Sequence, residues 1–122
     1  MPAQLNHLIV HARDSQVSAR FLADILGLPE PGRSGPFLTV AAANGVTLDF
    51  IDAEGDIPPQ HYAFLLSEAE FDESFERIRS RKLPYWADPA RRLKGEIYHH
   101  NGGRGVYFED PSGHFLEILD WH

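Results

Sequence analysis

The chain of 122 residues contains no cysteine. Thiolate zinc sites, cysteine nucleophiles and thiol redox chemistry are therefore excluded, and this composition is compatible with a reducing cytosol. No apolar run approaches the length of a membrane-spanning helix, and the N-terminal segment lacks the basic and apolar regions of a secretory signal. The sequence predicts a cytoplasmic protein with no membrane partner.

Positively charged residues are also few. The chain has 11 Lys and Arg residues and 18 Asp and Glu residues, which gives a net charge of −7. This balance argues against nucleic acids and anionic membranes as partners. A chain of this length buries roughly two thirds of its unfolded surface and needs no disulfide to fold. We expect a single domain over residues 1–122 that acts on a small molecule.

The sequence repeats one pattern twice, over residues 4–53 and 58–121. Each copy begins with an apolar strand near a histidine, His7 or His61, and continues into an amphipathic helix. In both copies an apolar residue follows this histidine by 10 positions and a phenylalanine follows it by 14. These residues are Val17 and Phe21 in the first copy and Phe71 and Phe75 in the second. The shared register indicates two equivalent structural units.

Capping residues mark the predicted helices. The first helix should begin at Asp14 or Ser15 and end at Gly27. Ser67 and Glu70 have the spacing of a capping box at the start of the second helix. Local chemistry therefore predicts where both helices start.

Each copy ends in a predicted strand hairpin, with turns at residues 43–45 and 110–113. The second copy is longer at residues 88–103, which we expect to form a long functional loop. The predicted fold class is α+β: two tandem βαβββ units that form a curved mixed sheet, with helices on its outer face and a hollow on the other face.

Four polar side chains point into this hollow if side chains alternate along the predicted strands. His7, His61 and Glu117 come from three strands, and the repeat places Asp49 at the position that corresponds to Glu117. Two imidazoles and one carboxylate are typical ligands of an open catalytic metal site. We therefore predict a divalent metal at His7, His61 and Glu117. Asp49 is a further ligand, a hydrogen-bonding partner or a base beside the metal.

A metal with open positions would stabilise negative charge on a substrate that chelates it through two oxygen atoms. Glu117 or Asp49 as a base would permit proton transfer next to a carbonyl. Addition of thiol or water to an epoxide and ring-opening oxygenation with Fe(II) are the other reactions open to this set. The expected metals are Zn, Mn, Ni or Fe(II). A different class of function is a metal-free protein that sequesters a small ligand in the hollow.

Three segments resemble the vicinal oxygen chelate superfamily of glyoxalases, bleomycin-resistance proteins and extradiol dioxygenases: residues 5–7, 61–64 and 106–117. The last two are most similar to fosfomycin-resistance proteins. The resemblance implies a paired βαβββ fold, the same three metal ligands and a homodimer. It also implies a catalytic role for Tyr107 at the substrate, although the alternative is a packed strand tyrosine.

The chain departs from the fosfomycin thiol transferases at two positions. It has Ile9 where those proteins carry a threonine near the metal, and the expected phosphonate-binding lysine falls in residues 97–100, which contain none. Both departures argue against fosfomycin as the substrate.

Overall fold

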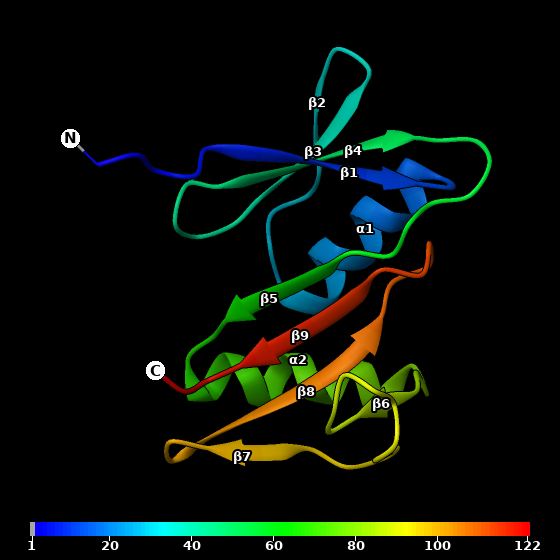
Figure 1. Ribbon diagram of the computed structural model, residues 1–122. Coiled ribbons are helices and arrows are strands. Elements are labelled where there is room, and N and C mark those ends of the chain that lie inside the picture. The colour runs from blue at the N-terminus through cyan, green and yellow to red at the C-terminus, as the bar shows by residue number, and fades with distance from the viewer. Residues whose placement is uncertain (1) are drawn as a thin grey trace. The chain divides into compact units, whose positions relative to one another are not determined.

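The computed structural model describes residues 2–122. They form two helices and nine strands in two compact units, and the division falls between Ile57 and Pro58. The α+β class and the tandem arrangement are confirmed, and the strands pair in two sheets, one in each unit (Figure 1). Neither helix in this part of the chain is long and apolar enough to cross a membrane.

The first unit pairs four strands in the order β1-β4-β3-β2. β1 is parallel to β4, and the other pairs are antiparallel. Helix α1 packs against β3, β4 and β1, and Val10, Leu48 and Phe50 are buried in the core of the unit. The elements are β1 (His7–Ala12), α1 (Ser15–Leu26), β2 (Gly32–Ser34), β3 (Phe37–Ala41) and β4 (Thr47–Asp52).

Helix α1 begins and ends as its capping residues predict. The Asp14 carboxylate accepts the N–H groups of Gln16 and Val17, and Gly27 ends the helix with a left-handed φ of 66°. The prediction that Val17 lies on the apolar face is wrong, because its side chain is 51% exposed. The small residues Ser18 and Ala19 occupy the buried face instead.

The second unit pairs its strands in the order β5-β9-β8-β6, and β7 also pairs with β8. Helix α2 lies behind this sheet in Figure 1. Its residues Phe71 and Ile78 are buried, and Phe75 contacts Tyr85 with ring centroids 5.1 Å apart. The elements are β5 (His61–Leu65), α2 (Glu68–Ser80), β6 (Tyr85–Trp86), β7 (Tyr98–His100), β8 (Gly103–Glu109) and β9 (Phe115–Leu119).

Residues 88–103 are more regular than the predicted long loop. The Asp88 carboxylate accepts the N–H groups of Arg92 and Leu93, which closes a tight turn. Lys94 then forms an isolated antiparallel β-bridge with Trp86, and β7 follows as an antiparallel partner of β8. The inserted segment is therefore a turn and a strand that extend the second sheet.

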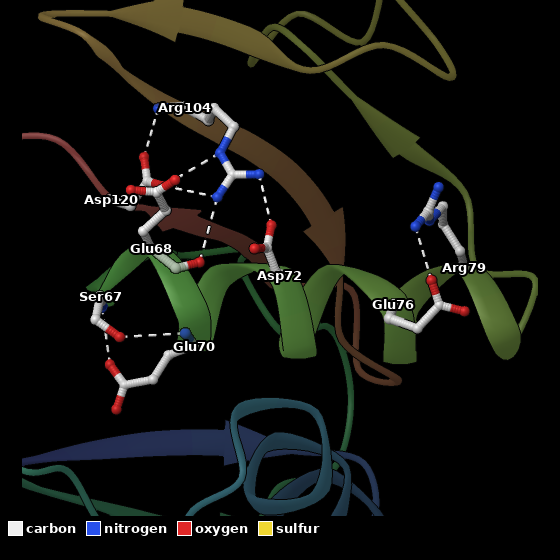
Figure 2. A network of polar contacts seen from close by, with 8 residues as sticks. All are labelled: Ser67, Glu68, Glu70, Asp72, Glu76, Arg79, Arg104 and Asp120. Carbon is white, nitrogen blue, oxygen red and sulfur yellow. Dashed lines mark hydrogen bonds and ion pairs between the residues drawn. The ribbon is translucent and has the colours of Figure 1, made fainter.

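The capping box of α2 is present as predicted. Ser67 Oγ accepts the Glu70 N–H at 3.1 Å, and Glu70 Oε1 accepts the Ser67 N–H at 2.8 Å (Figure 2). This backbone hydrogen bond lowers the pKa of Glu70 below its ordinary value of 4.5. Its charge therefore stabilises the fold above about pH 4.5, and the contribution is lost as the pH falls through the lowered pKa.

We expect Glu70→Gln to lower the melting temperature at pH 7, because glutamine keeps an acceptor but loses the charge. The difference from the wild type should shrink as the pH falls toward 3. Thermal melts across this range test the prediction, with Glu73→Gln on the same helix as control. A difference that grows toward low pH would contradict it.

Candidate functional site

His61 and Glu117 lie together on neighbouring parallel strands of the second unit. His61 pairs with Phe115 and Ala63 pairs with Glu117, so the histidine and the acid sit diagonally across β5 and β9. The distance from His61 Nε2 to Glu117 Oε1 is 3.1 Å, with side chains 46% and 9% exposed. Two ligands of one ion lie roughly 3.0–3.4 Å apart when each bond is about 2.0–2.2 Å long. The two donor atoms therefore have the spacing of adjacent metal ligands.

The second oxygen of Glu117 is held by Tyr98, a residue that the sequence analysis did not single out. The Tyr98 hydroxyl lies 2.5 Å from Glu117 Oε2, and Trp121 Nε1 lies 2.8 Å from the same hydroxyl. Burial, and then the hydrogen bond to Glu117, raise the pKa of Tyr98 far above its ordinary value. The phenol therefore keeps its proton as a donor at any physiological pH.

In the sequence, Gly105 is the residue that could have indicated Tyr98. This glycine lies inside β8, and a Cβ atom there would overlap the ring of Tyr98. Glycine inside a strand often marks the close approach of another group. Trp121 completes this cluster, because its indole N–H donates to the Tyr98 hydroxyl.

Tyr107 also lies beside His61 and Glu117. It is directly opposite Glu117 in the β8–β9 pairing, and its ring centroid is 5.6 Å from that of His61. Its ring stacks on Phe115 at 5.3 Å with an interplanar angle of 11°. Burial and the nearby Glu117 charge raise the pKa of Tyr107. The structure thus brings Tyr107 to His61 and Glu117, and its role toward a substrate stays a prediction.

His7 and Asp49 occupy the corresponding positions of the first unit. His7 pairs with Thr47, two residues before Asp49, which is the offset that separates Phe115 from Glu117. Asp49 Oδ1 is buried, and no group among residues 2–122 forms a hydrogen bond to it. A buried oxygen without a donor is suited to a cation or to a protonated partner.

The ring of His7 is oriented by its neighbour Asn6, whose Oδ1 lies 2.8 Å from His7 Nδ1. An amide oxygen only accepts hydrogen bonds, so Nδ1 is the donor in this contact, and a neutral His7 ring then has its free lone pair on Nε2. Histidines that bind metals commonly donate their other N–H to an oxygen in this way. The tautomer of His7 therefore fits a metal ligand.

The predicted ligands are divided between the two units, with His61 and Glu117 in the second and His7 and Asp49 in the first. Within residues 2–122 no three His, Asp or Glu side chains form a group that could hold a metal ion. The spacing of the His61–Glu117 pair, the His7 tautomer and the orphaned Asp49 oxygen each fit the chemistry of a divalent ion.

The guanidinium group of Arg104 is held by several partners within the second unit. It lies 2.7 Å from Asp72 and 2.9 Å from Asp120, and it also donates to the Glu68 carbonyl at 3.3 Å (Figure 2). It covers the ring of Phe71 at 4.3 Å. Arg104 thus joins β8 to α2 and has a structural role in the second unit.

Arg91 lies closer to the aromatic residues of the site. Its guanidinium covers the ring of Phe115 at 4.1 Å and is 3.4 Å from Glu109. Phe115 in turn stacks on Tyr107. The positive charge of Arg91 therefore lies at one end of a row of ring contacts that runs from Phe115 through Tyr107 to His61.

The family model of the Glyoxalase/Bleomycin resistance protein/Dioxygenase superfamily matches residues 4–118. The chain belongs to this superfamily. It is 33% identical to glutathione transferase FosA of Serratia marcescens over 125 residues, which cover 97% of this chain and 81% of that protein. It is 30% identical to fosfomycin resistance protein FosX of Listeria innocua over 130 residues, which cover 97% of this chain and 90% of that protein.

Among solved structures, Oxidase ChaP-H2 is 60% identical and superposes with a TM-score of 0.97, over 100% of this chain and 96% of that one. The relatives are enzymes, so the prediction of an enzyme of this superfamily is confirmed. The likeness to fosfomycin-resistance proteins is confirmed as well. The identity to the oxidase, however, is much higher than the identity to either of those two relatives.

Proposed function

We propose that this protein is a divalent-metal-dependent oxidase that acts on a small substrate chelating the metal through two oxygen atoms. The observation that carries this proposal is the 60% identity to Oxidase ChaP-H2 along the whole chain. The candidate ligands support it, because two histidines and one carboxylate with open positions are typical of non-haem Fe(II) oxygenases. Fe(II) is therefore the metal that we propose, in preference to Zn, Mn or Ni.

In this proposal His7, His61 and Glu117 hold the ion. Asn6 Oδ1 contacts Nδ1 of His7, and the 3.1 Å between His61 Nε2 and Glu117 Oε1 is compatible with two ligands of one ion. When bound, Fe(II) supplies positive charge toward the substrate oxygens and redox chemistry toward dioxygen. Asp49 is a base or a further ligand, and Tyr107 contacts the substrate.

Fosfomycin-type epoxide opening is the second candidate, suggested by the similarity to FosA and FosX. Two features make it the weaker one. Arg104 is bound by Asp72 and Asp120, and Tyr98, from the segment expected to supply a phosphonate-binding lysine, contacts Glu117 instead. A phosphonate would lack the cations that such chemistry needs at these positions.

The test is metal content followed by turnover. Protein expressed in metal-replete medium and reconstituted with Fe(II) without oxygen should hold one iron per chain, and it should consume dioxygen with some members of a panel of catechols and hydroxyketones. Tight Zn or Ni with no oxygen uptake would contradict the oxidase and favour Lewis-acid chemistry. Absence of any bound metal would favour the sequestering protein. Addition of glutathione to fosfomycin would establish the second candidate.

We also propose a homodimer. β1 and β5 are edge strands of their sheets, and they expose large apolar side chains, with Ile9 49% and Leu65 55% exposed. Exposed strand edges and apolar surface are commonly covered by a partner subunit. Light scattering should give twice the chain mass at micromolar concentration, and a monomer mass throughout would contradict the proposal.

A further inference from the structure

A chain of hydrogen bonds runs from Trp121 through Tyr98 to Glu117 and ends at His61. The distances are 2.8 Å from Trp121 Nε1 to the Tyr98 hydroxyl, 2.5 Å from that hydroxyl to Glu117 Oε2, and 3.1 Å from Glu117 Oε1 to His61 Nε2. Its members come from β7, β9, β5 and the residues after β9, all within the second unit. Each oxygen of Glu117 thus has its own partner.

The direction of these hydrogen bonds follows from the chemistry of the two ends. An indole N–H can only donate, so the Tyr98 oxygen must accept from Trp121. An ionised carboxylate can only accept, so the Tyr98 proton must be donated to Glu117 Oε2. Trp121 therefore removes the rotational freedom that a tyrosine hydroxyl normally has. Hydrogen bonds to a charged acceptor are also the shorter and stronger kind, in agreement with the 2.5 Å distance.

We propose that Tyr98 is a positioning residue that turns Glu117 into a one-oxygen metal ligand, and that Trp121 fixes the hydroxyl that does so. This inference rests on the proposed metal site. The bond to Tyr98 uses one of the two lone pairs of Oε2 and holds the carboxylate with Oε1 toward His61, which favours binding of an ion through Oε1 alone. A proton taken up at Oε2 would compete with this bond, so we assign proton transfer to Asp49.

The residues around Tyr98 leave room for its ring and hold Trp121 in place. Gly105 leaves the space that the ring occupies, since a Cβ atom at that position would overlap it. Trp121 is held in turn by His100, whose ring meets the indole edge-on at 4.4 Å. Groups that orient a metal ligand commonly affect metal affinity about 10- to 100-fold when they are removed.

The experiment compares Tyr98→Phe with Tyr85→Phe by titration with Co²⁺ alone. Tyr85 is a matched control because it packs on Phe75 of α2 and not on Glu117. We expect Tyr98→Phe to raise the Kd for Co²⁺ about 10-fold. We also expect weaker d–d absorption bands, because a released Glu117 can bind through both oxygens and raise the coordination number. Tyr85→Phe should match the wild type in both measurements.

Trp121→Phe is the second variant, and it decides the question if Tyr98→Phe does not fold. It keeps the Tyr98 hydroxyl but removes the donor that fixes its direction, so the same changes should appear to a smaller extent. If the wild type binds Co²⁺ and neither variant differs from it in affinity or spectrum, the inference is overturned while the metal site stands. If the wild type binds no divalent ion, the proposed function itself fails, and the inference fails with it.

Discussion

We expect His61→Ala and Glu117→Ala each to weaken metal binding more than about 100-fold, and Asp49→Ala to weaken it only about 10-fold. Each of the first two variants removes one of three proposed protein ligands, and an open site has no spare ligand to replace it. Asp49 has a shorter side chain than Glu117 and no partner on its buried oxygen. It therefore contributes through charge or through a weaker contact.

Metal analysis after dialysis against graded chelator measures these affinities. The control is His99→Ala, which removes another exposed histidine in the same unit, from the strand position next to Tyr98. All four variants should fold, because His61 and His99 are exposed and the other changes remove side-chain charge without adding bulk. The wild type should melt higher with metal than with chelator, by linkage, and the His61→Ala protein should show no such difference. A His61→Ala protein that keeps stoichiometric metal would refute the assignment.

The helix ends could be predicted from the sequence because short-range chemistry determines them. Asp14, Gly27 and Ser67 act on N–H and C=O groups within a few residues, so their spacing alone is informative. The alternation of side chains along strands likewise placed His61 and Glu117 on the same face. Their contact at 3.1 Å follows from the parallel register of β5 and β9.

Tyr98 could not be found in this way. Its partners are 19 and 23 residues away, in a segment whose pattern suggested only a loop. Val17 shows a different limit, since small residues such as Ser18 and Ala19 can line a buried helix face as well as large ones. His114 directly follows the turn at residues 110–113, and its buried ring accepts the Gln60 N–H at Nδ1, 3.0 Å away. Such tertiary contacts leave no periodic signal.

The second large effect is expected at Gly105, where alanine should destabilise the protein by about 1–3 kcal/mol. The new Cβ atom would overlap ring atoms of Tyr98, so the ring must leave its place against Glu117. Backbone conformation does not contribute, because Gly105 does not have a left-handed φ. Gly32→Ala is the control, as it is also a strand glycine with an ordinary φ and its Cβ would approach only Thr39 Oγ1, at 3.1 Å.

A double-mutant cycle separates the clash from any other cost of the substitution. In a Tyr98→Ala background the ring is gone, so Gly105→Ala should be neutral or slightly stabilising, because alanine loses less backbone entropy on folding than glycine. Denaturant unfolding of the four proteins gives the interaction energy, which should equal most of the single-mutant cost. If Gly105→Ala lowers the free energy of unfolding equally in both backgrounds, its effect does not come from a clash with the Tyr98 ring. If the destabilisation disappears without the Tyr98 ring, Gly105 provides the space for the ring that contacts Glu117.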